Sequence, residues 1–343
     1  MLAKTNIKKL KNLKYANINA KLKGMYSRFL SKEELEKLSK QNNLKAAVYF
    51  IKNELDVLNS IDENVDRRYL EKELDKTLIE DICKIKDILN SKDKEIFDIC
   101  ISKYEIKCII EAYKMVQNNI GSEDIEKNIF LWTDKVFKNI KGIEKSKDIE
   151  QFIKTLKRSK FFNTVNNYIQ SKNENKADLE TNLNKVYLKN LYNKAPKVSK
   201  KAQELIGENI DLLNISWIYR MKKYYNLSEE KVMENLIDVN YKIDKNQIKK
   251  LINSSNDEEF KENIKSTKYA KILGKEPLNL LELTINKYIY KKCKNEFSKA
   301  EYNLNTVFCY MRLKEYQKQN LINILGGISY NLDQKVITEK IIT

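Results

Sequence analysis

The sequence predicts an all-α protein, and three observations carry this prediction. Glycine occurs only 7 times and proline only 2 times in 343 residues, which leaves few residues for the tight turns of a sheet. Apolar residues recur every three or four positions in several windows, as they do along one face of a helix. No stretch alternates between apolar and polar residues for long enough to predict a strand.

The expected helices follow in order from their start signals and their apolar stripes. Ser31 stands three residues before a glutamate, which is the spacing of a capping box, and Ser228 stands directly before two glutamates that favour a first helical turn. Pro196 and Pro277 fall between periodic segments, where they would end or begin helices. The stripes consist of Leu70, Leu74, Leu78, Ile82, Ile85 and Leu89, then of Ile96, Ile99, Ile106, Ile109, Ile110 and Tyr113, and finally of Leu304, Val307, Phe308 and Met311.

The chain is strongly basic, with 65 lysines and arginines against 48 aspartates and glutamates and a formal net charge of +17. Only 6 of the basic residues are arginines, and the lysines are scattered through every segment. Proteins that read nucleic acids usually rely on the planar fork of arginine, so the scattered lysines indicate first a solvated surface. A basic patch for an acidic protein, anionic lipid headgroups or nucleic acid is the alternative.

The composition excludes several classes of catalytic site. Histidine is absent, which rules out Ser-His-Asp and Cys-His catalysis and sites in which histidine binds zinc or haem. The sequence has no phosphate-binding P-loop, GxGxxG fingerprint, HExxH helix or calcium loop. We therefore predict no catalytic, cofactor-binding or metal-binding residue and no cofactor. An enzyme that uses a carboxylate or a thiol remains an alternative.

The cysteines and the apolar runs bear on the cellular compartment. No apolar run approaches the roughly 18 residues that span a bilayer, and residues 1–15 lack the apolar centre of a secretory signal. We expect a cytoplasmic protein, or one that is attached to a membrane only through a partner. Buried free thiols in a reducing compartment are expected for the five cysteines, which form no C-x-x-C pair and lie at helical spacings: Cys83, Cys100, Cys108, Cys293 and Cys309.

A long internal repeat is the most informative feature of the sequence. A serine-led helix start and then a Leu-Glu pair occur in each third of the chain, and a polar pair follows them. The polar pairs recur every 106 residues and are Glu105 with Cys108, Asp211 with Asn214, and Gln317 with Asn320. This repeat predicts three similar helical subdomains, residues 1–117, 118–224 and 225–343, in an arc or a pseudo-threefold ring. The alternative is a helical bundle that is repeated three times but encloses no functional central cavity.

The chemistry of the polar pairs differs between the three units. Within each pair the residues lie one helical turn apart and face the same way. The first pair combines an acid with a thiol, the second an acid with an amide, and the third two amides. Since no chemistry is shared, we expect these positions to make hydrogen bonds between helices or to line a cavity rather than to catalyse a reaction.

The aromatic residues raise one further alternative. Eight of the 20 tyrosines directly adjoin a lysine, and Tyr224 and Tyr225 follow the pair Lys222 and Lys223. Interleaved basic and aromatic residues can form a surface on which single-stranded bases stack. In an amphipathic helix this pattern more often marks the boundary between core and solvent. No recognition motif accompanies the charge, so nucleic acid is not an expected partner. A basic helical protein that binds nucleic acid or acts as a scaffold is the alternative function.

Three segments resemble the C-subunit family of V-type (A/V-type) ATP synthases, which is also the family of the vacuolar ATPase d subunit. Residues 15–25 (YANINAKLKGM) and 30–35 (LSKEEL) are similar to its opening. Residues 211–222 (DLLNISWIYRMK) are similar to its central signature, and residues 310–321 (YMRLKEYQKQNL) to its closing one. The segments occur in the right order and span nearly the whole chain.

The resemblance implies an all-α funnel of three related subdomains around a central cavity. It further implies a non-catalytic central-stalk component at the cytoplasmic face of the membrane. One end of the funnel would receive the D and F subunits of the central shaft, and the other would sit on the proteolipid (c/K) ring. Torque from ion-driven rotation of the ring would then reach the catalytic head, where ATP forms. The chain departs from the family pattern where Lys21 and Lys23 replace arginines, Gln317 replaces an acid and Cys108 replaces an asparagine.

Overall fold

The structure, a computed structural model, describes residues 15–54, 67–119, 137–171, 176–299, 301 and 303–343. Within these ranges the regular secondary structure is helical and contains no strand, so the all-α prediction is confirmed. The first half of the chain contains a helix over residues 15–26, α2 (Lys32–Ser39), α3 (Leu44–Glu54), α4 (Arg67–Ile88), α5 (Ser91–Cys100), α6 (Ser102–Gln117), η2 (Lys138–Ile140), η3 (Ile143–Lys145), α8 (Ile149–Thr155), η4 (Leu156–Arg158) and α9 (Phe162–Gln170).

The second half contains the longest helices. In chain order it comprises α10 (Lys176–Lys194), η5 (Ala195–Lys197), α11 (Lys200–Tyr225), α12 (Glu229–Asn235), α13 (Lys245–Ile252), α14 (Asp257–Lys265), α15 (Ala270–Leu273), η6 (Leu278–Leu280), α16 (Leu281–Lys299), α17 (Asn305–Ser329) and α18 (Gln334–Glu339). The η elements are single turns of 3₁₀ helix that connect the longer ones.

Local side-chain chemistry starts several of these helices. Ser31 and Glu34 form the expected capping box of α2, in which each side chain accepts a hydrogen bond from the backbone N–H of the other. Ser228 caps α12 in the predicted way. Pro196 lies in η5, and Pro277 directly precedes η6 and α16, so both prolines stand at helix boundaries as expected.

The first and third predicted apolar stripes are buried in the core, whereas the second needs a correction: Ile99 is only half-buried, and the side chain of Ile96 lies outside the described part of the structure. All six residues of the stripe from Leu70 to Leu89 are buried. The second stripe is divided between two helices, because α5 ends at Cys100 and α6 begins at Ser102. The Ile101 backbone N–H bonds back to Phe97, which closes α5 without a glycine or proline signal that the sequence could have shown. All four residues of the third stripe are buried on or beside α17.

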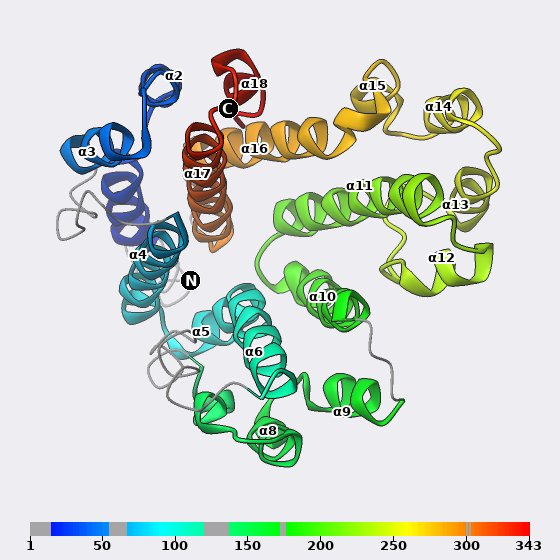
Figure 1. Cartoon of the computed structure of the whole chain (residues 1–343), viewed down its shortest axis with the longest axis horizontal. Coiled ribbons are helices and arrows are strands. Elements are labelled where there is room, and N and C mark those ends of the chain that lie inside the picture. Colours follow the sequence, from blue (N-terminus) through cyan, green and yellow to red (C-terminus); the bar gives the residue numbers. More distant parts are fainter. Residues whose placement is uncertain (1–14, 55–66, 120–136, 172–175, 300, 302) are drawn as a thin grey trace, which may run out of the picture.

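The two ends of the described chain share one apolar core. Leu35 and Leu38 of α2 and Val48 of α3 belong to the same buried cluster as Leu321 and Ile324 of α17. Burying side chains of this size contributes roughly 1.5–3 kcal/mol each. Figure 1 shows α2, α3 and α4 beside α17 and α18, so the last third of the chain packs back onto the first.

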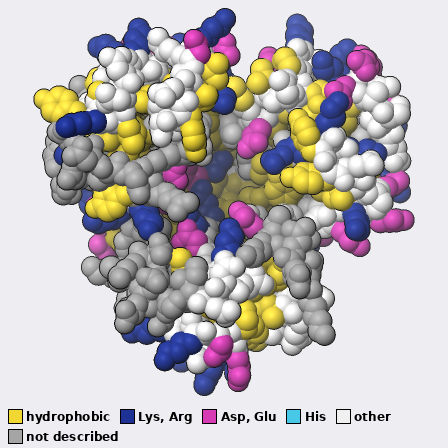
Figure 2. Space-filling model, viewed as in Figure 1, with side chains coloured by type: hydrophobic (Ala, Val, Ile, Leu, Met, Phe, Trp, Pro, Cys, Tyr) yellow, Lys and Arg dark blue, Asp and Glu magenta, His cyan; other side chains and the backbone are white. Residues whose placement is uncertain are grey.

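The remaining helices form two further groups around the middle of the molecule. α6 packs against α8 and α10, and α11 packs against α13 and α16. In both groups a long helix contacts a short helix that follows it and the next long helix along the chain. Similarly, α17 contacts the short helix α18 that follows it and the long helix α4 from the first part of the chain. Figure 1 shows the three groups surrounding a common middle, and Figure 2 shows that the same face is hollowed there.

Candidate functional site

The asparagines of the second and third polar pairs make matching buried hydrogen bonds. Asn214 on α11 donates from Nδ2 to the carbonyl of Ile237 and accepts from its N–H, both at 3.0 Å. Asn320 on α17 does the same with Ile342, at 2.9 Å and 2.8 Å. Each amide thus satisfies both backbone groups of a residue that follows the next short helix, α12 or α18.

The acids of the first and second pairs are also hydrogen-bonded. The Asp211 carboxylate accepts from the backbone N–H groups of Tyr241 and Lys242, at 3.1 Å and 2.6 Å, and from the Tyr269 hydroxyl at 2.7 Å. Glu105 accepts from the Ser159 hydroxyl at 2.7 Å. Burial raises the pKa of both carboxyl groups, and the hydrogen bonds they accept oppose that rise. Both acids therefore hold the segments that follow against a long helix.

The remaining two positions of the repeat behave differently. Cys108 is buried on α6, and burial raises the pKa of its thiol. Gln317 is 8% exposed, and its Nε2 has no hydrogen-bond acceptor among the described residues. The three pairs lie on α6, α11 and α17, and no hydrogen bond joins one pair to another in the described part of the chain. The repeat residues therefore do not assemble into one site.

The cysteines give no sign of a reactive thiol. No disulfide joins any of the five in the described part of the chain; Cys108, Cys293 and Cys309 are buried as expected, whereas Cys83 and Cys100 are half-buried. Burial raises the pKa of Cys100 to about 12. The pKa of Cys309 is also raised, by its hydrogen bond with Cys293 and by burial. A raised pKa keeps a thiol protonated and poorly nucleophilic.

Charged side chains gather where α4, α6 and α17 meet. We call this set the charged seam; it consists of Asp75 on α4, Lys103 and Lys107 on α6, and Glu315 and Lys318 on α17. The Asp75 side chain is only 6% exposed and forms ion pairs with both Lys107 and Lys318. Burial opposes the charge of Lys107, but the attraction and the hydrogen bond of Asp75, together with the nearby Glu111 and Cys108, raise the pKa of the ammonium group above its usual value.

Glu315 is the second anchor of the charged seam. It pairs with Lys103, accepts a hydrogen bond from the Tyr104 hydroxyl at 2.9 Å and forms an ion pair with Arg312 at 2.8 Å. Burial opposes its charge, but Lys103 and Arg312 hold the pKa of Glu315 below its usual value. Burial lowers the pKa of Lys103 to about 8, although Glu315 favours the charged form. Both partners are therefore mainly ionised at neutral pH.

A third acid extends this connection between α4 and α17. Asp81 accepts a hydrogen bond from the Tyr310 hydroxyl at 3.0 Å and pairs with Lys314 at 2.9 Å. Burial, followed by the charge of Asp81, raises the pKa of Tyr310. Polar contacts rather than apolar contacts alone thus join α17 to both α4 and α6.

The charged seam and the hollow suit a polar partner. Figure 1 shows α4, α6 and α17 around the middle of the molecule. In Figure 2, Lys, Arg, Asp and Glu side chains surround the hollow at that place, and hydrophobic side chains lie deeper within it. Charges of both signs fix the orientation and register of a protein–protein contact. An interface built from such charges forms and separates more readily than an extended apolar interface does.

The described residues hold few other candidate sites. No group of three or more acidic or cysteine side chains within them is arranged to hold a metal ion. Among the described helices, none combines the length and apolar character that crossing a bilayer requires.

Comparison with known proteins gives the class of this chain and then its family. The helices and the charged side chains around the hollow define the class: an all-helical protein whose hollow has a charged surface. The family model described as ATP synthase (C/AC39) subunit matches residues 18–340, and the chain therefore belongs to this family.

Three relatives carry the same description, the C subunit of an A-type ATP synthase. The protein of Methanosphaera stadtmanae is 21% identical over 90% of this chain and 82% of its own length. The protein of Pyrococcus abyssi is 23% identical over 95% of this chain and 89% of its own length. The protein of Pyrococcus furiosus is 22% identical over the same shares of the two chains. The family resemblance seen in the three sequence segments is thus confirmed.

The charged seam was missed by reasoning from the sequence. Its members lie far apart, and Asp75 and Lys318 are separated by 243 positions. One signal was present in the sequence: Asp75 and Asp81 each adjoin a residue of the apolar stripe on α4, which places a charge at the edge of a buried face. Such an acid requires a cation, but the stripe does not tell which lysine supplies it.

Proposed function

We propose that this chain is a non-catalytic central-stalk subunit of a rotary V/A-type ATPase or ATP synthase. In this role it couples the proteolipid (c/K) ring in the membrane to the D and F subunits of the central shaft. The observation that carries the proposal is the match of the family model to residues 18–340. The relatives' shared description, the C subunit of an A-type ATP synthase, supports the same assignment.

The proposal includes three related subdomains, residues 1–117, 118–224 and 225–343, in a pseudo-threefold funnel. The matching bonds of Asn214 with Ile237 and of Asn320 with Ile342 support the equivalence of α11 and α17. The common packing of α6, α11 and α17, each against short helices that follow and against another long helix, extends the comparison to the first unit. The hollow in Figure 2 is the proposed socket for the shaft.

The charge of the chain suits a socket that must resist shear and still assemble from separate parts. A polar wall holds a helical rod through many charged and hydrogen-bonded contacts, whereas an apolar interface of equal size would favour permanent association. The net charge of +17 would steer the chain towards acidic surfaces of the ring, the shaft or the surrounding headgroups. The proposed location is peripheral, on the cytoplasmic face of the membrane, through the complex.

Reconstitution with purified components tests this function. The full chain should form a complex with D and F and should bind membranes that contain the proteolipid ring. Both associations should weaken as salt rises above about 0.15 M, where exposed charges are screened beyond about 8 Å. Ion-driven ATP synthesis should require the chain, while ATP hydrolysis by the isolated head should not. Unchanged coupling without the chain, or tight salt-sensitive binding to nucleic acid with no binding to D and F, would refute the proposal.

A further inference from the structure

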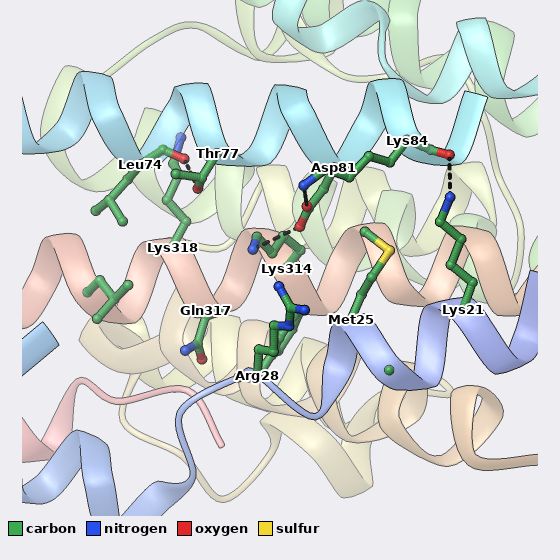
Figure 3. Close-up of a pocket in the computed structure, with 13 residues that line it drawn as sticks. Lys21, Met25, Arg28, Leu74, Thr77, Asp81, Lys84, Lys314, Gln317 and Lys318 are labelled. Atoms are coloured by element: carbon green, nitrogen blue, oxygen red, sulfur yellow. Dashed lines mark hydrogen bonds and ion pairs between the residues drawn. The ribbon is translucent and has the colours of Figure 1, made fainter. Parts of the chain in front are cut away.

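A cavity of about 430 Å³ lies between the helix over residues 15–26, α4 and α17. Its described lining includes five cationic side chains, Lys21, Arg28, Lys84, Lys314 and Lys318, and a single carboxylate. Figure 3 shows Lys84 and Lys314 reaching towards Asp81 with Arg28 close by, whereas Lys21 reaches the backbone carbonyl of Lys84 and Lys318 points towards α4. The volume lies within the range of about 300–1,000 Å³ that is typical of sites for small ligands.

Lys318 is already paired with Asp75, but the carboxylate of the lining, Asp81, does not balance the four remaining cations. It already pairs with Lys314 at 2.9 Å, lies 3.5 Å from Lys84 and accepts a hydrogen bond from Tyr310. The Arg28 side chain forms no ion pair or hydrogen bond with a described residue, and it is exposed. In Figure 3 its guanidinium group points towards the head group of Lys314. Two cations that face each other across a cavity attract an anion between them.

Gln317 supplies a second and independent observation. Its side chain lines the same cavity, the residue is only 8% exposed, and its Nε2 donor has no acceptor among the described residues. Glu105 and Asp211 occupy the corresponding positions of the repeat, and both are carboxylates with hydrogen-bond donors around them. In the third unit a donor stands where the other units have an acceptor. A buried donor of this kind favours a ligand that brings oxygen atoms.

Apart from Thr77, the side chains of the remaining wall are apolar, and they limit the class of ligand. Met25, Phe29, Leu74 and Leu321 face the cavity. We propose that this cavity binds a small organic phosphate. The phosphate oxygens accept hydrogen bonds from Arg28, Lys314 and the Gln317 amide, and the organic part packs against the apolar wall. Arginine and lysine together match the charge and geometry of a phosphate group better than those of a single carboxylate.

Calorimetric titration of the full chain at low ionic strength tests the proposal with three probes: AMP, inorganic phosphate and adenosine. AMP should bind, adenosine should not bind measurably, and inorganic phosphate should compete with AMP but bind more weakly. Failure of AMP to bind at millimolar concentration would overturn the proposal. Equal affinity for AMP and inorganic phosphate would overturn the role of the apolar wall and with it the assignment to an organic phosphate.

Three variants locate the binding. Arg28→Gln removes the charge, and Gln317→Glu replaces the donor by a carboxylate of the same shape. Each should weaken AMP binding roughly ten- to hundredfold, because each removes a hydrogen bond to a charged group. Arg158→Gln is the matched control, since Arg158 is also exposed, lies in η4 and does not line the cavity. Wild-type affinity in Arg28→Gln, or an equal loss in Arg158→Gln, would refute the site.

A separate measurement excludes unfolding as the cause of lost binding. In Gln317→Glu the new carboxylate lines the same cavity as Arg28 and Lys314, so its thermal midpoint should equal or exceed that of the wild type. Lost AMP affinity together with a retained midpoint supports the site, whereas a clearly lower midpoint contradicts the cationic surroundings on which it rests. The outcome is independent of the proposed coupling role, which reconstitution tests separately.

Discussion

Replacing Asn320 or Asn214 by alanine should destabilise the fold by similar amounts. Each asparagine satisfies one backbone N–H and one backbone carbonyl, at distances between 2.8 Å and 3.0 Å in a buried setting. An unsatisfied buried backbone group costs about 1–3 kcal/mol, and water that enters the space left by the side chain recovers part of this cost. We therefore expect each variant to lose about 2–4 kcal/mol in its free energy of unfolding, and the two losses to agree within about 1 kcal/mol.

Urea unfolding followed by circular dichroism measures both losses, with the midpoint and the slope fitted separately. Asn323→Ala is the control on the same helix, since Asn323 accepts only an exposed hydrogen bond from Gln319. It should change the free energy of unfolding by less than about 0.5 kcal/mol. A loss as small as that of the control in Asn320→Ala or Asn214→Ala would refute the reasoning about buried backbone groups. A large loss in one variant alone would refute the equivalence of α11 and α17.

Two further predictions concern the charged seam and the buried tyrosines. Asp75→Asn leaves Lys107 and Lys318 without their carboxylate, so the free energy of unfolding in urea should fall by about 1–3 kcal/mol, while Asp98→Asn, which removes an exposed pair with Lys86, should change it little. Burial raises the pKa of Tyr269 and Tyr310 above the usual value of 10.0. Their stabilising contribution is thus complete below pH 10 and is lost as the pH rises further, because the unfolded chain ionises first. As the pH is raised, part of the phenolate absorbance should appear only when the helical circular dichroism is lost. Titration of every tyrosine near pH 10 while the helical circular dichroism is retained would contradict this.

Local signals in the sequence predicted the parts of the fold that neighbouring residues determine. The capping box of Ser31 and the buried stripe from Leu70 to Leu89 depend on residues within a few turns, and both were predicted correctly. The division between α5 and α6 was missed. Ile101 continues the apolar pattern without interruption, and only the backbone bends there.

Long-range contacts could not be predicted in the same way. The repeat identified Asn214 and Asn320 as corresponding positions, but not that each would bind the backbone of a residue about 22 positions further on. The pairing of Asp75 with Lys318 was beyond prediction for a different reason. With 59 lysines in the chain, charge alone leaves too many possible partners for one buried acid. Composition gives the number of charges, whereas only packing decides which of them meet.

The ion pairs between α4 and α17 have a consequence for how these helices can move. The two helices run antiparallel, because Asp75 pairs with Lys318 while Asp81, further along α4, pairs with Lys314, earlier on α17. A slide of α17 by one helical turn, about 5.4 Å, would break both pairs at once and leave the buried Asp75 with Lys107 as its one remaining partner in the charged seam. Apolar ridges alone would oppose such a slide less strongly, since one leucine or isoleucine replaces another across the contact. For a protein proposed to transmit torque, the charged seam thus fixes the register of α17 against shear along its own axis.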